Sequence, residues 1–156
     1  MPASIIKPRF FSNFVEVPGA EDARRSISLA RLKSALEASW VPGTAYLGAC
    51  RAGNPALGQC YPTARVVQWF FPRFEIARGE VDTGAALERH FWNIDPGGNP
   101  PMHVDFTWQQ FEGGSTVTGF DVVDRHALND SPATVERCER LLERVLVHLG
   151  NSRPAD

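Results

Sequence analysis

The sequence predicts an α+β domain in which helices pack on a small antiparallel sheet. Two segments, 29–40 and 135–149, repeat apolar residues at intervals of three and four, the spacing of an amphipathic helix. Between them, segments 90–94 and 102–106 are typical of short strands, and the turn at 95–101 contains three prolines and two glycines. Helices that flank an antiparallel hairpin indicate the α+β class.

The N-terminal third begins with a segment that has no regular period. Residues 1–25 mix aromatics with prolines and are predicted to form an extended N-terminal arm. Ser26 or Ser28 can cap a helix that runs to about Trp40, where a Pro-Gly pair ends it. Residues 43–59 are predicted to form a loop.

The second helix is predicted to begin at Cys60 or the next residue. Pro62 suits a first turn, where its missing N–H costs no hydrogen bond, and Pro72 stops the helix. Residues 74–77 alternate apolar and polar side chains and predict a half-buried strand, whereas 79–88 reads as a polar connection.

The C-terminal third is predicted to hold one more strand and one long helix. After the hairpin, a short helical turn is expected at 107–111 and a further strand at 116–123. Ser131-Pro132 begins the last helix, and the arginines at 137, 140 and 144 have acidic neighbours, which predicts a solvated helix face. The 156 residues are predicted to form a single domain with a compact core at 26–150.

Composition excludes several classes of protein. A net charge of −2 gives no basic footprint for nucleic acid or an anionic membrane. Three cysteines do not form a disulfide framework, and no stretch resembles a signal peptide or a membrane span. We therefore expect a cytoplasmic protein with free thiols, no nucleic-acid or membrane partner and no cofactor; the oligomeric state stays open.

Three residues stand in the contexts that a thiol–imidazole–carboxylate site needs. Cys60 lies where a glycine-bearing loop turns into a helix, and His90 and Asp105 lie on the two strands of one hairpin. A helix N-terminus and a nearby imidazolium both favour the reactive thiolate. Unpaired N–H groups at the helix start can receive an oxyanion, and a carboxylate can fix the orientation of the imidazole.

The motifs around these residues resemble known families. His90-Phe91-Trp92 followed by Asp105-Phe106-Thr107 is similar to the transglutaminase-like branch of the papain-like superfamily. A closer resemblance, over roughly residues 35–112, is to the small bacterial YunG-like family, through Asn54-Pro55-x-x-Gly58-Gln59-Cys60-x-x-Thr63-Ala64, His90-x-Trp92-Asn93 and Asp105-x-Thr107-x-x-Gln110-Phe111. Tyr61-Pro62 after the cysteine departs from the Cys-Trp pair of transglutaminases, so their acyl-acceptor preference is not carried over.

The resemblance implies a papain/transglutaminase-like fold and a catalytic triad of Cys60, His90 and Asp105. The implied activity is acyl transfer, or hydrolysis of an amide or thioester, through a thioester intermediate on an acyl or peptide-like substrate. Papain-like proteases place an oxyanion-stabilising glutamine six residues before the cysteine. Asn54 occupies that position here, and Gln59 is the other carboxamide candidate.

Three further residues are expected in the pocket, and two alternatives stay open. Trp92 and Asn93 follow the histidine and are expected to shape the pocket, with His103 beside them. One alternative is a catalytically inactive binding module that keeps the fold and the pocket. The other is a zinc site in which His103 joins Cys60, His90 and Asp105 as a ligand; the triad interpretation requires no metal.

Overall fold

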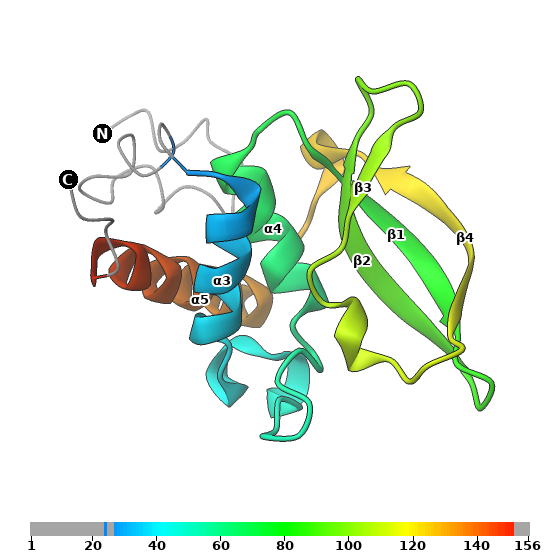
Figure 1. Ribbon diagram of the computed structural model, residues 1–156, viewed down its shortest axis with the longest axis horizontal. Coiled ribbons are helices and arrows are strands. Elements are labelled where there is room, and N and C mark those ends of the chain that lie inside the picture. The colour runs from blue at the N-terminus through cyan, green and yellow to red at the C-terminus, as the bar shows by residue number, and fades with distance from the viewer. Residues whose placement is uncertain (1–23, 25–26, 152–156) are drawn as a thin grey trace.

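The computed structural model describes residues 24 and 27–151. In this part of the chain three α-helices pack on a four-stranded antiparallel sheet, which confirms the predicted α+β class (Figure 1). The helices are α3 (Leu29–Ser39), α4 (Cys60–Phe70) and α5 (Pro132–Asn151), and the strands are β1 (Glu75–Asp82), β2 (Leu87–Asp95), β3 (Met102–Val104) and β4 (Thr116–Val123). The predicted arm at 1–25, apart from residue 24, lies outside the described residues.

The sheet has the strand order β3-β2-β1-β4, with every neighbouring pair antiparallel. The prediction of a polar connection at 79–88 was wrong, because these residues complete β1 and begin β2, and the hairpin turn occupies only 83–86. Val81 is buried, whereas its neighbours Glu80 and Asp82 face solvent, as does the start of β2. Apart from Leu87, the outward side chains of the two strand ends in this hairpin are polar or charged, so the sequence of these paired strands resembled that of a loop.

The other strands follow the sequence more closely. The strand predicted at 116–123 is confirmed as β4 and forms one edge of the sheet beside β1. β3 ends at Val104, two residues earlier than predicted, and pairs only with Asn93–Asp95 of β2. The edge of β2 at His90 is therefore not covered by β3.

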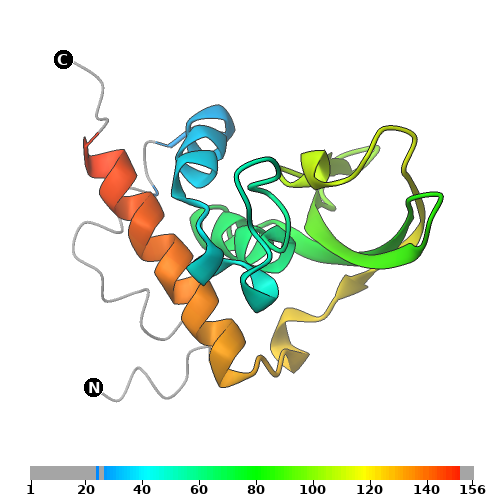
Figure 2. The same cartoon turned by 90° about the horizontal axis from the view of Figure 1, so that it is seen from below.

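Helix α4 lies between the sheet and the other helices (Figure 2). It contacts β2 and β1 on one side and α5 on the other, while α3 packs against α5. Ser28 caps α3 by accepting a hydrogen bond from the Arg31 N–H at 3.1 Å, as one of the two predicted caps. The core between these elements is built from apolar side chains of all three helices. No helix in the described ranges is long and apolar enough to cross a membrane.

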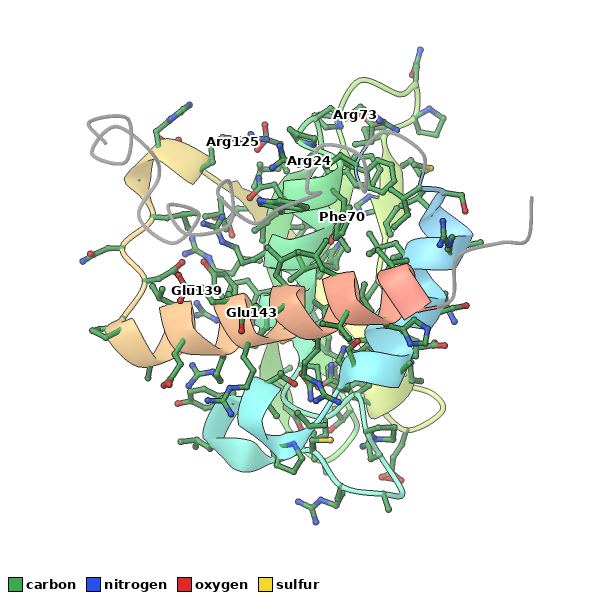
Figure 3. The ribbon with its side chains drawn as sticks, turned by 90° about the vertical axis from the view of Figure 1, so that its left-hand side faces the viewer. Arg24, Phe70, Arg73, Arg125, Glu139 and Glu143 are labelled. Atoms are coloured by element: carbon green, nitrogen blue, oxygen red, sulfur yellow. The ribbon has the colours of Figure 1, made fainter. Side chains whose placement is uncertain are left out.

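Arg125 ties the end of β4 to the beginning of the sheet (Figure 3). Its guanidinium donates to the carbonyl oxygens of Pro72 and Phe74, at 2.6 and 3.1 Å, and to the Glu75 carboxylate at 3.1 Å. Because these partners lie just after α4 and at the start of β1, one side chain fixes the helix end and both neighbouring strands.

Candidate functional site: Cys60, His90 and Asp105

Cys60 is the first residue of α4, as predicted, and its side chain is partly exposed. The turn that delivers it depends on Gly58, which has a φ of +80° and accepts a hydrogen bond from the Tyr46 N–H at 2.8 Å. A Cβ at this glycine would lie 3.1 Å from the Tyr46 nitrogen, so both the backbone conformation and the space favour glycine. Pro62 is the third residue of α4 and lies in the first turn. The N–H that proline lacks is not missed there, because the Gly58 carbonyl already accepts from the Tyr46 N–H.

His90 is fully buried on β2, and its ring is held by aromatic neighbours. It stacks on Trp92 with ring centroids 5.5 Å apart, and Phe111 meets it edge-on at 4.8 Å. The Nε2 atom lies 2.7 Å from Oδ2 of Asp105, so this nitrogen donates to the carboxylate. The structure therefore brings together two of the three predicted catalytic residues in a short, charge-assisted hydrogen bond.

The pKa of His90 shows that Cys60, the third predicted catalytic residue, also acts on the imidazole. Burial alone lowers this pKa, because a low-dielectric surrounding penalises the imidazolium. The hydrogen bond to Asp105, together with the hydrogen bonding and charge of Cys60, outweighs burial and raises the pKa of His90 to about 9. The imidazole is thus a cation at neutral pH.

The second ring nitrogen of His90 has no well-aligned hydrogen bond within the described part of the chain. The Cys60 thiol is nevertheless near enough to stabilise the imidazolium. Because Asp105 occupies Nε2, we assign Nδ1 as the nitrogen that faces the sulfur. A thiol near the imidazole without a well-aligned hydrogen bond to it is the geometry that a substrate-free site often has.

Asp105 serves two purposes with its two oxygens. While Oδ2 binds the imidazole, Oδ1 accepts from the Thr107 N–H at 3.2 Å and lies 3.4 Å from the Thr107 hydroxyl. The latter contacts form a local turn that leads into the short 3₁₀ helix Trp108–Gln110. This turn fixes the carboxylate, so the local role and the role toward His90 support each other.

The predicted pocket residues lie on β2 and β3 around this pair. Trp92 is buried and donates from Nε1 to Nδ1 of the exposed His103 at 2.9 Å, while its ring covers Gly79 of β1. Asn93 is buried and donates to the Ala64 carbonyl of α4 at 2.9 Å. Since Asn93 joins the strand of His90 to the helix of Cys60, it positions the two side chains rather than touching a substrate.

Both carboxamide candidates for the oxyanion site are engaged elsewhere. Gln59 is fully buried, and its side chain accepts from the Thr44 hydroxyl at 2.8 Å and donates to the Val41 carbonyl at 3.1 Å. Asn54 donates to the Gln110 carbonyl at 3.0 Å. Gln59 thereby anchors the loop at 41–44 under the start of α4, and Asn54 joins the loop before the cysteine to the turn after Asp105.

Cys60 opens into a cleft of about 720 Å³, which we call the Cys60 cleft. Its walls come from the loop at 46–58, the start of α4, β2 and the beginning of α5, and include Tyr46, Leu57, Arg89, Phe91 and Arg137. Of the three arginines predicted on a solvated helix face, Arg140 and Arg144 are exposed, whereas Arg137 is half-buried, lines the cleft and lies 5.4 Å from the ring of Tyr46. Sequence spacing alone carries no signal for residues that converge from three separate elements.

The zinc alternative has little geometric basis. In the described residues no group of three or more His, Cys, Asp or Glu side chains is arranged to hold a metal ion. His103, the ligand that distinguishes this alternative from the triad, uses Nδ1 to accept from Trp92.

Comparison with protein families identifies the family of this chain. The sequence model described as the YunG protein matches residues 28–150, which include the whole site. No curated protein and no solved structure matches the chain. The family match covers well over half of the chain, and the motifs around Cys60, His90 and Asp105 lie within it. The chain therefore belongs to the YunG family.

Proposed function

We propose that this protein is a thiol-dependent acyltransferase, or an amide or thioester hydrolase, of the papain/transglutaminase-like kind. The observation that carries the proposal is the pairing of a buried imidazolium, bound to Asp105 at 2.7 Å, with a partly exposed cysteine at a helix start. A positive ring beside the sulfur stabilises the thiolate, and the first-turn N–H groups add a partial positive charge.

In the proposed reaction, the Cys60 thiolate attacks the substrate carbonyl carbon. A C–S bond forms, and the carbonyl oxygen takes the negative charge. The backbone N–H of Cys60 is free to receive this oxyanion, because helix N-termini leave such donors unpaired. When the intermediate collapses, the bond to the amine or thiol leaving group breaks and His90 Nδ1 gives its proton to that group.

The second half returns the enzyme to its starting state. Water or another acceptor attacks the thioester carbonyl and transfers a proton to Nδ1 of His90. Collapse then breaks the C–S bond and releases the Cys60 thiolate with the acyl product. Asp105 keeps Nε2 protonated and the ring oriented through both halves.

The test is the capture of the acyl-enzyme with a small activated ester. Incubation with p-nitrophenyl acetate should add one acetyl group to Cys60, detected by intact mass and peptide mapping, and neutral hydroxylamine should remove it because thioesters are labile to it. His90→Ala should slow this acylation by about 10²-fold or more, the usual contribution of a general acid–base. If Cys50 is acetylated as fast as Cys60, or if His90→Ala does not change the rate at Cys60, the proposed activity is wrong and the binding-module alternative is favoured.

A further inference from the structure

We infer that the Cys60 cleft takes an acyl substrate that carries a carboxylate, and that Arg89 and Arg137 bind this group. This inference rests on the proposed function, because it specifies the substrate of the same cysteine. The evidence for it is the set of charged side chains on the cleft wall, some of which already form ion pairs while others do not.

Arg137 projects from α5 into the cleft with its charge uncompensated. Its two side-chain contacts are with neutral groups: the Thr134 hydroxyl accepts from Nη2 at 3.0 Å, and the Tyr46 ring lies 5.4 Å from Cζ. The Nε atom is buried without a hydrogen-bond partner, and no carboxylate of the described chain lies within ion-pair distance of this guanidinium. The cleft thus presents a guanidinium that lacks an anion.

Arg89 adds a second cation to the cleft, from β2. It precedes His90 on β2, is exposed, and forms no ion pair with any side chain in the described ranges, although Glu80 is its partner across the strands. Arg78 also lines the cleft, but its guanidinium binds Asp121 at 2.8 Å. Arg78 therefore provides a matched control, since it has the same charge and location but an existing partner.

The acidic residues of the wall do not cancel these charges. Asp130 accepts from the Tyr61 hydroxyl at 2.7 Å and lies 3.8 Å from the buried Arg65, so its charge is used within the fold. Among the residues that the structure describes, Glu88 is the one further carboxylate that lines the cleft. Two arginines without an anion thus face one exposed glutamate, in a chain whose net charge is −2. The positive cleft is a local feature and does not follow from the overall composition.

The rest of the lining suits an organic acid. Tyr46, Leu57 and Phe91 supply apolar surface to the cleft that the arginines and Cys60 also line. An acyl chain can pack there, while its carboxylate reaches the guanidinium groups in the bidentate manner that arginine favours.

The experiment compares two alkylating reagents that differ mainly in charge. Iodoacetate carries a carboxylate and iodoacetamide is its neutral analogue, and the rate of each at Cys60 is followed by peptide mass spectrometry. The double variant Arg89→Gln/Arg137→Gln should lower the iodoacetate-to-iodoacetamide rate ratio at least about twofold, because one exposed ion pair contributes about 1.4- to fivefold. High salt should lower the wild-type ratio in the same direction.

The controls separate this inference from the proposed function. Arg78→Gln should change the ratio less than either single variant, and Arg137→Lys, which keeps the charge, should retain most of the preference if Arg137→Gln disturbs the fold. An unchanged ratio in a folded double variant overturns the carboxylate inference. Cys60 that reacts with iodoacetamide no faster than Cys50, with no dependence on His90, would instead overturn the proposed function.

Discussion

Raising the pH through the titration of His90 should weaken the fold. The folded state holds this imidazolium with Asp105 and Cys60, which raises its pKa to about 9, whereas the unfolded chain has the ordinary value of about 6.5. Between these values the native state binds more protons than the unfolded state. The stabilisation is therefore complete below about pH 6.5 and is lost as the pH rises through about 9.

The size of this effect follows from the difference between the two pKa values. At about 1.36 kcal/mol per pH unit, the difference corresponds to about 3 kcal/mol. This is a large part of the stability of a domain, which is typically about 5–15 kcal/mol. Asp105→Asn removes a partner that raises the pKa of His90, so the lowering by burial weighs more heavily in the variant. The loss of unfolding free energy between neutral and alkaline pH should therefore be smaller than in the wild type.

Two assays check this reasoning. Urea unfolding at a series of pH values should show wild-type stability falling between about pH 6.5 and pH 9 relative to His90→Gln, which has no titrating ring. NMR titration of the histidine ring protons, with His90 assigned from the same variant, should give the pKa directly. A His90 pKa at or below about 6.5, the ordinary value, would refute the account of the buried imidazolium.

Three substitutions around the site have different expected outcomes. Gly79→Ala places a Cβ 2.7 Å from the Trp92 ring, so it should lower the free energy of unfolding in urea by about 1–3 kcal/mol, the usual cost of overpacking. Asn93→Ala removes the side-chain hydrogen bond from β2 to the Ala64 carbonyl of α4 and should cost about 0.5–1.5 kcal/mol, while also slowing alkylation of Cys60 in the folded protein because this link between helix and strand is lost. His103→Ala should slow alkylation of Cys60 less than Asp105→Ala does, and a metal chelator should leave the melting temperature unchanged.

The parts of the fold that were predicted from the sequence depend on local signals. The cap at Ser28 and the helix starts at Cys60 and Pro132 each follow from a few neighbouring residues. The pairing of His90 with Asp105 could also be predicted from the sequence, because one hairpin joins β2, which carries His90, to β3, which ends one residue before Asp105, and so limits how far apart the two residues can lie.

Other features depend on contacts between distant segments. The hairpin at 79–88 is polar because it projects into solvent, so its composition resembled a connection. Gln59 was considered for the oxyanion site because it precedes the cysteine, but the segment at 41–44 captures its side chain. The convergence of Arg89 and Arg137 on one cleft follows from the packing of α5 beside α4, which no local pattern encodes.

The most direct test of the central claim is the rate at which iodoacetamide alkylates Cys60 at about pH 6. A free thiol, with a pKa near 8.5, is almost wholly protonated there and reacts slowly. If His90 stabilises the thiolate, Cys60 should react at least about tenfold faster than Cys50 and the buried Cys138, and His90→Ala should abolish this advantage. Equal rates at Cys60 and Cys50, unchanged by the loss of His90, would contradict the assignment of a catalytic triad.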